Sequence, residues 1–272
     1  MEITKMHGLG NDFILIDNRE GKERDLGALA KRLCQRRLSV GADGLMAVEN
    51  SASCPVKMRI INADGSEAEM CGNGIRCFAR FVYDRGIVRE EAFDVETLAG
   101  TMRPGLIVEN GQVKAVRVDM GVPSFARRDL PMLGEGSSEK ETIEIEGERL
   151  EIGAVLMGVP HAVYLTEDHS RLEELGPRIE THPIFPKKTN VNFCRLIDRG
   201  TVAVSTWERG AGATLACGTG ASGTVALLHR LGLVDKVCTV KLKAGDLLIE
   251  CAEDGRVFMT GPAAYVFEGR LL

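Results

Sequence analysis

The chain has 272 residues, of which 44% are hydrophobic and 27% charged, as in an ordinary water-soluble protein with one large domain or two average ones. Its formal net charge of -5 gives no electrostatic basis for binding nucleic acid or an anionic membrane. No apolar run is long enough to span a bilayer, and the first residues do not resemble a signal peptide, so we expect a cytoplasmic location.

Eight cysteines are spread along the chain, but none of them forms a Cys-x-x-Cys pair and no His-x-x-x-His motif accompanies them. This spacing argues against a zinc site, and we predict no metal. A chain without a secretion signal is also not expected to carry a disulfide framework. Most of these thiols should therefore behave as small buried hydrophobic groups.

The first predicted helices lie in the N-terminal half. One is expected over Asp25–Arg37. A second should begin after Cys71, because Ile75, Ala79 and Val82 form an apolar stripe at helical spacing. A glycine at position 86 fits the residue just past the end of that helix.

Strands are predicted on either side of residue 120. β-branched or alternating segments flank the turns Asn110-Gly111 and Asp254-Gly255, which is typical of antiparallel hairpins. The polar residues 134–142 are expected to form a mobile surface loop. A further helix is predicted over Ser170–Thr181 and a strand over Val202–Trp207.

The chain contains an internal repeat at an offset of 146 positions, the separation of Cys71 and Cys217. Both cysteines begin a Cys-Gly-x-Gly motif, both motifs are followed by an apolar-periodic run, and Gly86 falls on Gly232. The similarity continues for about fifty residues in the same order, which favours duplication over chance. The linker between the halves is predicted near Met120–Pro123.

Each half therefore reads as a run of strands, one central helix that begins at Cys-Gly-x-Gly, and more strands. This order predicts an α+β fold of two pseudo-symmetric domains, each a curved, mostly antiparallel sheet around a central helix, with the site in the cleft between them. Small residues in the second helix suit a buried position, namely Ala221, Ser222, Gly223 and Ala226.

The glycine-rich helix starts indicate acid–base chemistry. Free backbone N–H groups and the helix dipole at such a position favour a thiolate. Two thiols on matching scaffolds can face one substrate, so that a carbon acid loses its proton to one thiol and regains one from the other. The result is inversion at that carbon. The alternative is that Cys71 and Cys217 are both core residues in similar turns.

Three long motifs resemble those of the diaminopimelate epimerase family. The first is Met6-His7-Gly8-Leu9-Gly10-Asn11-Asp12-Phe13. The second runs from Asn62-Ala63-Asp64-Gly65-Ser66-Glu67 to Cys71-Gly72-Asn73-Gly74-Ile75-Arg76-Cys77-Phe78. The third runs from Trp207-Glu208-Arg209-Gly210-Ala211-Gly212 to Ala216-Cys217-Gly218-Thr219-Gly220. The resemblance extends from Lys5 to the end of the chain without a large gap.

The resemblance implies a cofactor-independent isomerase that interconverts the LL and meso forms of 2,6-diaminoheptanedioate in lysine and peptidoglycan biosynthesis. It implies that Cys71 is the proton donor and Cys217 the proton acceptor in the LL-to-meso direction, and that His161 and Glu208 tune the two thiol pKa values. It also implies a homodimer. The expected domains are residues 1–120, completed by 263–272, and residues 121–262.

The substrate has two carboxylates and two ammonium groups. Backbone N–H groups at the two helix starts can hold one carboxylate, and Arg209 offers a fork for another. By the resemblance, the expected substrate-binding residues are Asn11, Asn62, Gly72, Asn73, Asn190, Glu208, Arg209, Gly218 and Thr219. By spacing alone, each asparagine would be better explained as a turn or cap. Arg76 and Arg80 are assigned to the polar face of their helix.

Three positions depart from the family pattern. Val159 stands where many members have asparagine, Ala213 where many have glutamate, and Gly44 where some have glutamine. These departures bear on recognition of the distal end of the substrate and leave the reaction type unchanged.

Three alternatives remain. Gly218-x-Gly220-x-x-Gly223 matches a dinucleotide fingerprint, but the loop Glu208–Cys217 separates it from the preceding strand, and its surroundings suggest hairpins and not crossovers. A racemase of another amino acid on the same fold is a closer alternative. The third is a redox-sensing Cys71–Cys217 pair, in which we regard oxidation as a liability of the enzyme.

Overall fold

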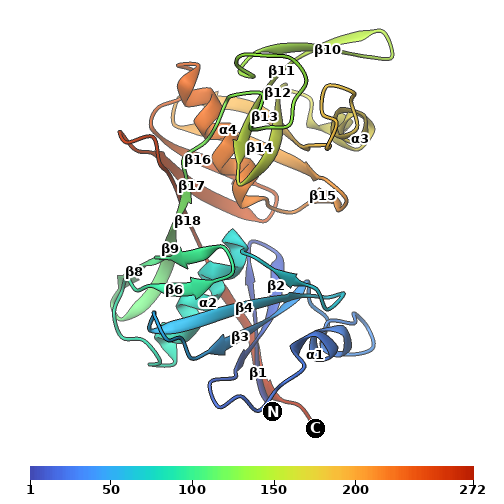
Figure 1. Cartoon of the computed structure of the whole chain (residues 1–272). Helices are drawn as coiled ribbons and strands as arrows, with labels where there is room; N and C mark the ends of the chain where they lie inside the picture. Colours follow the sequence, from blue (N-terminus) through green and yellow to red (C-terminus); the bar gives the residue numbers. More distant parts are fainter. The chain divides into compact units, whose positions relative to one another are not determined.

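The computed structural model describes residues 1–272, which form two compact units (Figure 1). Unit 1 comprises 1–119 and 260–272, and unit 2 comprises 120–259. No helix is long and apolar enough to cross a membrane. The two units account for an α+β fold that is mostly sheet, as the sequence predicts.

Unit 1 contains a mixed sheet in the order β19-β1-β2-β3-β4-β6-β7, with β5 paired to β4, and the antiparallel hairpin of β8 and β9, in which β9 also neighbours β18. Its helices are α1 (Leu26–Leu33) and α2 (Gly72–Asp84). Its strands are β1 (Glu2–Gly8), β2 (Asn11–Asp17), β3 (Gly44–Glu49), β4 (Val56–Asn62), β5 (Glu67–Ala68), β6 (Val95–Thr97), β7 (Gly100–Met102), β8 (Gly105–Glu109), β9 (Gln112–Gly121) and β19 (Ala264–Arg270).

Unit 2 contains strands in the order β10-β11-β12-β13-β14-β16-β17-β18, with β15 paired to β14. Its helices are a 3-10 turn (His169–Arg171), α3 (Leu172–Glu180) and α4 (Gly218–Arg230). Its strands are β10 (Glu141–Ile145), β11 (Glu148–Met157), β12 (Val159–Leu165), β13 (Asn190–Asp198), β14 (Thr201–Glu208), β15 (Gly212–Thr214), β16 (Val237–Leu242), β17 (Gly245–Cys251) and β18 (Val257–Gly261).

The strand registers of the two units confirm the internal repeat. In unit 1, Met46 on β3 pairs with Ile60 on β4; in unit 2, Asn192 on β13 pairs with Thr206 on β14. The short strands follow the same rule, because Ile60 pairs with Ala68 and Thr206 with Thr214. All these positions are related by the offset that relates the two cysteines.

Most strand pairs are antiparallel, but each unit also has two parallel pairs joined through a helix. The helices α1 and α2 connect β2 to β3 and β4 to β6, and the helices α3 and α4 connect β12 to β13 and β14 to β16. The expectation of hairpins without crossovers around the cysteine motifs is therefore wrong. The hairpin signals seen in the sequence belong to the strands that follow each crossover.

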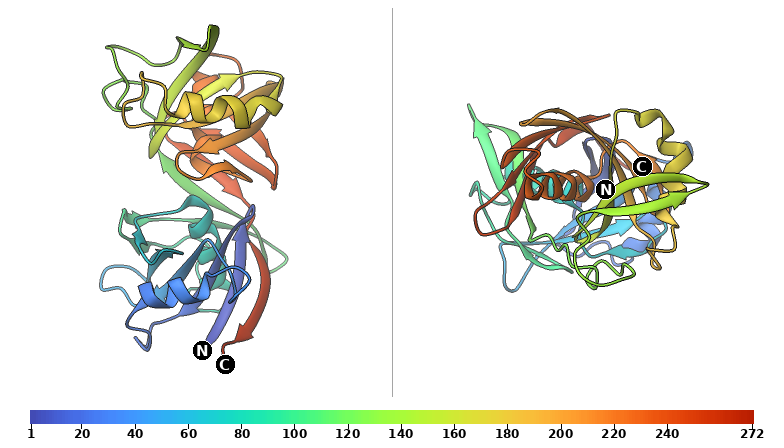
Figure 2. Two further views of the ribbon diagram at one scale, coloured as in Figure 1. Left: turned by 90° about the vertical axis from the view of Figure 1, so that its right-hand side faces the viewer. Right: turned by 90° about the horizontal axis from the view of Figure 1, so that it is seen from above.

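The two 13-residue helices that follow the cysteines pack against the sheets of their own units (Figure 2). Helix α2 contacts β1, β2 and β3, and α4 contacts β11, β12, β13 and β17. Residues 220–228 of α4 are all buried, so its small residues have the predicted role. Small side chains let the helix backbone approach the strands closely, which fixes the start of the helix.

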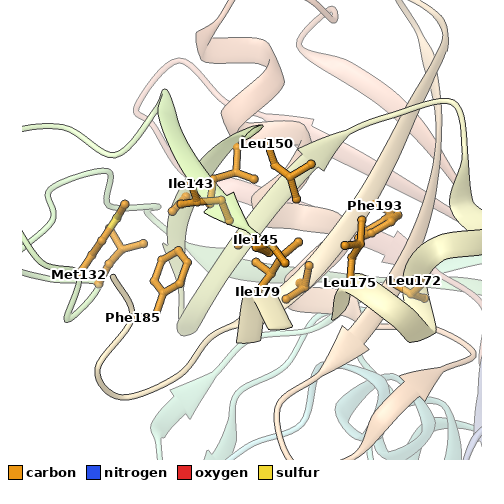
Figure 3. Packing of buried hydrophobic residues seen from close by; sticks show 14 residues of the cluster. Met132, Ile143, Ile145, Leu150, Leu172, Leu175, Ile179, Phe185 and Phe193 are labelled. Carbon is orange, nitrogen blue, oxygen red and sulfur yellow. The ribbon is translucent and has the colours of Figure 1, made fainter. Parts of the chain in front are cut away.

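Apolar clusters hold the shorter helices in place. In unit 2, Leu175 and Ile179 of α3 pack with Phe193 of β13 and with Ile143 and Ile145 of β10 (Figure 3). In unit 1, α1 packs through a separate cluster against strands β2 and β3. Helix α1 ends at Leu33 and not at Arg37, because Arg37 adopts a φ of 72° and the backbone N–H of Gly41 caps the Leu33 carbonyl.

The expected place of Arg76 on a polar helix face is wrong: it is fully buried and donates to the carbonyls of Pro262 and Gly72, while Arg80 donates to Ala263. The expected surface loop is found in part. Residues 134–140 lie outside the helices and strands and are mostly exposed, but Ser138 among them is fully buried and its hydroxyl bonds to the carbonyls of Phe125 and Ala154.

Candidate active site

Each of the two cysteines caps the N-terminus of its helix. The Sγ of Cys71 accepts the backbone N–H of Gly74 at 3.4 Å, and the Sγ of Cys217 accepts that of Gly220 at 3.4 Å. Both residues have extended backbone, as an N-cap requires. The predicted position of both thiols at the positive end of a helix dipole is confirmed.

In unit 1, Asn11 lies beside Cys71. The β1–β2 hairpin turns through Leu9 and Gly10, both with positive φ, and so places Asn11 at the start of β2. Asn11 Oδ1 accepts from Cys71 Sγ at 3.4 Å and from Asn73 Nδ2 at 3.5 Å. Its Nδ2 donates to Asp43 Oδ2 at 2.8 Å. Three predicted site residues therefore meet at the start of α2.

A charged cluster supports Asn11 from behind. Arg36 bridges Asp12 and Asp43, and Lys5 pairs with Asp12 at 2.7 Å. Burial raises the pKa of Asp12, but the hydrogen bonds from Arg36 and Lys5 outweigh it and lower the pKa to about 2. Both carboxylates are thus held in fixed positions, and Asp43 orients the Asn11 amide. The sequence did not predict the role of Asp43, because a single aspartate gives no indication that it will contact Asn11 in the fold.

Asn62 occupies the end of β4, opposite Gly44 on β3. Its Nδ2 donates to Ser66 Oγ at 2.9 Å. A Cβ at Gly44 would lie 2.9 Å from the Ile61 carbonyl, so the local backbone leaves no room for a larger residue there. The close approach of the paired strand beside Asn62 therefore accounts for the glycine at position 44.

In unit 2, Cys217 is buried, with 5% of its surface exposed, and its Sγ lies 3.4 Å from Thr219 Oγ1. Burial, together with smaller contributions from the charge of Glu208 and from its hydrogen bond to the thiol, raises the pKa of Cys217 to about 12. The helix start acts in the expected direction, because the Gly220 N–H lowers the pKa. Burial outweighs it, so Cys217 is a protonated thiol at neutral pH.

Glu208 is the last residue of β14 and pairs with Gly212 across a tight turn. The turn is held from the neighbouring strand, because Asn190 Oδ1 accepts the backbone N–H of Arg209 at 2.8 Å. The Arg209 side chain is exposed and donates to the Lys187 carbonyl at 2.8 Å. Of the predicted site residues, Asn190, Glu208 and Arg209 are thus brought together, and Glu208 reaches Cys217.

His161 is fully buried on β12, opposite Asn190 on β13. Burial lowers its pKa to about 3, with a smaller contribution from the charge of Arg209. Its Nδ1 lies 3.1 Å from Asn192 Nδ2, while its Nε2 is buried without a partner. Sequence reasoning missed Asn192 and Thr206; the available signal was that polar residues stand at two repeat positions whose counterparts are Met46 and Ile60.

Close packing explains why two positions of the second motif are occupied by glycine. A Cβ at Gly220 would lie 2.3 Å from Asn192 Oδ1, and one at Gly223 would lie 3.0 Å from Val155 Cγ1. The spacing that matches a dinucleotide fingerprint is thus explained by packing of α4 on its sheet. In addition, the side chain of Cys217 already caps the amide of Gly220, one of those that would otherwise be free to bind a phosphate.

Known proteins resemble the chain over its whole length. It is 50% identical to the diaminopimelate epimerase of Desulfitobacterium hafniense over 278 residues, covering 100% of this chain and 98% of that one. It is 49% identical to the diaminopimelate epimerase of Moorella thermoacetica, covering 99% and 98% of the two chains.

Solved structures share the fold at low identity. A Bacillus anthracis phenazine biosynthesis protein of the PhzF family aligns with a TM-score of 0.72 and 15% identity, covering 100% of this chain and 99% of that one. A hydroxyproline epimerase from Agrobacterium vitis aligns with a TM-score of 0.70 and 17% identity, covering 99% and 91%. The family model described as diaminopimelate epimerase matches residues 3–126 and 153–266. The chain belongs to the diaminopimelate epimerase family.

Proposed function

We propose that the protein interconverts LL- and meso-2,6-diaminoheptanedioate by proton transfer at the α-carbon, without a cofactor, in lysine and peptidoglycan biosynthesis. The observation that supports this most is the pair of N-capping thiols at equivalent positions of a duplicated unit, Cys71 and Cys217, in a chain about half identical to diaminopimelate epimerases. A two-base inversion needs two such groups, one to remove the proton and one to return it.

In the proposed mechanism, Cys217 takes the α-proton from the LL substrate and Cys71 donates a proton to the opposite face. The roles exchange in the reverse direction. The mechanism requires each thiol to reach one face of the substrate α-carbon in a site from which water is excluded.

The protonated state of Cys217 requires a step that forms its thiolate. Glu208 lies within hydrogen-bond reach of the thiol and carries a carboxylate, so it can accept the thiol proton once substrate is bound. A neutral thiol and a thiolate must coexist across the substrate, because the donor needs its proton at the moment the acceptor lacks one. Glu208 tunes the acceptor thiol in this scheme, and His161 is the second tuning group.

The proposed substrate contacts use backbone and side-chain groups around each thiol. The first amides of α2, at Gly72 and Asn73, and of α4, at Gly218 and Thr219, have no acceptor within their helix and favour a carboxylate. The remaining contacts are assigned to Asn11, Asn62, Asn190, Glu208 and Arg209.

Replacement of each thiol tests the function. Cys71→Ala and Cys217→Ala should each lose epimerisation of LL-diaminopimelate, measured by the optical rotation or chromatography of the products. Cys54→Ser is the matched control, because Cys54 is a half-buried free thiol in a loop outside both motifs. Full activity in either alanine variant would exclude the mechanism. Added pyridoxal phosphate should not change the rate of epimerisation, and a strict requirement for this cofactor would also exclude the mechanism.

A second candidate function is racemisation of another amino acid on the same fold. Val159 and Ala213 favour it, because they place apolar groups where many family members have polar ones. A substrate panel of LL-diaminopimelate, lysine, histidine, glutamate and proline, read by α-deuterium exchange, separates the candidates. Preference for any of the last four would replace the diaminopimelate assignment.

The family resemblance also supports a proposal for the quaternary state and the location. We propose a cytoplasmic homodimer that acts on a small amino-acid substrate. Light scattering after gel filtration should give twice the 29.5 kDa mass of the chain. A mass of one chain at working concentration would contradict the dimer.

A further inference from the structure

Three buried polar side chains, linked by short contacts, lie beneath the start of α4 and are called here the polar chain. Asn192 Nδ2 lies 3.1 Å from His161 Nδ1 and donates to the Ala162 carbonyl at 3.2 Å. Asn192 Oδ1 accepts the hydroxyl of Thr206 at 2.9 Å. His161 and Asn192 are fully buried and Thr206 is 2% exposed. The polar chain therefore runs from Thr206 through Asn192 to His161 with no contact to bulk water.

The same three positions of unit 1 are apolar. His161 pairs with Asn190 as Phe13 pairs with Gly44, and Asn192 pairs with Thr206 as Met46 pairs with Ile60. The three counterparts of the polar chain are Phe13, Met46 and Ile60, all of them buried.

Both sets lie against the start of the cysteine-bearing helix. A Cβ at Gly74 would lie 3.3 Å from Met46 Sδ and 3.5 Å from Phe13 Cζ. In unit 2, a Cβ at Gly220 would lie 2.3 Å from Asn192 Oδ1, and one at Gly223 would lie 3.9 Å from His161 Cδ2. Because an apolar set packs the same fold in unit 1, the polar set is not needed for folding. Burying polar groups is unfavourable, so their presence calls for a separate role.

The hydrogen bonds determine which nitrogen of His161 carries the proton. The Ala162 carbonyl can only accept, so the NH₂ group of Asn192 must face it, and the Thr206 hydroxyl then donates to the amide oxygen. The same NH₂ group faces His161 Nδ1, which must therefore accept. In a neutral imidazole the proton is then on Nε2, the atom that is buried without a partner.

We infer that Asn192 and Thr206 are positioning residues that hold His161 as the neutral Nε2–H tautomer, so that its single N–H donates to an acceptor present only in the substrate complex. This rests on the proposed function, in which His161 tunes the reacting groups. A neutral donor adds no charge beneath the start of α4, and its hydrogen bond forms only when an anionic acceptor arrives. The polar chain is thus an asymmetric feature that gives the second unit a chemistry the first unit lacks.

The tautomer can be measured without substrate. Nitrogen-15 spectra of the full-length protein labelled at histidine, with His161 assigned by loss of its signals in His161→Gln, should show a protonated Nε2 and an unprotonated Nδ1. The pattern should stay constant between about pH 5.5 and 8, because burial keeps the ring neutral. A protonated Nδ1 in the wild type would overturn the inference, whatever the activity on diaminopimelate.

Thr206→Val removes the hydroxyl that orients the Asn192 amide at nearly constant volume. We expect a mixture of the two His161 tautomers and a fall in kcat on the order of 10- to 100-fold, as for groups that orient histidines in other sites, with little change in KM. Thr206→Ser keeps the hydroxyl and should restore both readouts. Thr224→Val is the matched control, because Thr224 Oγ1 is buried in α4 without a partner and should be dispensable.

Asn192→Asp covers the case in which Thr206→Val fails to fold. Its carboxylate can only accept, so the His161 proton should move to Nδ1 and kcat should fall. A wild-type tautomer and wild-type kcat in Thr206→Val would overturn the inference. An inactive wild type with the Nε2–H tautomer would instead contradict only the proposed function.

Discussion

At the level of single residues, sequence spacing predicted the local backbone positions but missed side-chain contacts between residues far apart in the chain. The positions of Cys71 and Cys217 as N-caps followed from glycine and apolar patterns, which act locally. Arg76 could not be predicted as buried, because its acceptor, the Pro262 carbonyl, is 186 residues away. Asn192 and Thr206 were missed because their role depends on strand register, which only the folded sheet establishes.

Gly220 and Gly74 occupy the same position in the repeat but differ in what a methyl group would meet. In Gly220→Ala the methyl would clash with Asn192 Oδ1, at 2.3 Å, and we expect a loss of about 1–3 kcal/mol in unfolding free energy. In Gly74→Ala the nearest atoms lie at 3.3 Å or beyond, so helix propensity should make the change near neutral. Urea unfolding of both variants measures the difference, and equal stabilities would contradict the packing described.

Asp12 makes stability depend on pH. Its folded pKa of about 2 lies below the ordinary aspartate value of 3.8, so its contribution to stability is full above about pH 4 and is lost as pH falls toward 2. Asp12→Asn should lower the unfolding free energy by about 1–2 kcal/mol at pH 7. The gap in unfolding free energy between variant and wild type should narrow below pH 4. Urea unfolding at several pH values tests this, with Glu135→Gln, an exposed carboxylate outside the cluster, as control. A gap that stays constant with pH would contradict it.

At the level of elements, helices were found near their predicted positions, but connections were harder to predict. The hairpin signals around each cysteine motif were correct for the strands and wrong for the crossovers, because sequence periodicity does not say which strands become neighbours. The end of α1 was misplaced for a similar reason: Arg36 leaves the helix to bridge Asp12 and Asp43, a tertiary interaction.

The contact between α3 and Trp207 connects a core helix to the strand that carries Glu208. Trp207 Nε1 donates to Glu180 Oε2 at 2.8 Å, and a Cβ at Gly176 would lie 2.8 Å from the indole ring. Gly176→Ala should displace α3, lower the unfolding free energy by about 1–3 kcal/mol and shift the emission of this single tryptophan to the red. Gly105→Ala, where a methyl meets no atom within 4 Å, should change neither. Unchanged emission in Gly176→Ala would rule out the close contact.

At the level of the whole molecule, the duplication was the feature most accessible from sequence, because it repeats glycines and cysteines at one offset. The register of β3, β4 and β5 against β13, β14 and β15 confirms it residue by residue. The chemistry lies in the differences between the copies. Where unit 1 has Asn62, unit 2 has Glu208, and where unit 1 buries Phe13, unit 2 buries His161. Duplication supplies two thiols, and divergence gives them unlike surroundings.

The two-base proton transfer is tested most directly by deuterium incorporation at early conversion. LL-diaminopimelate incubated with the protein in heavy water should give meso product with one deuterium at the inverted α-carbon, while recovered LL substrate carries almost none. This follows because one thiol removes the substrate proton and the other delivers a solvent deuteron to the opposite face. Deuterium in the recovered substrate at the same level as in the product would indicate a single base and would contradict the account.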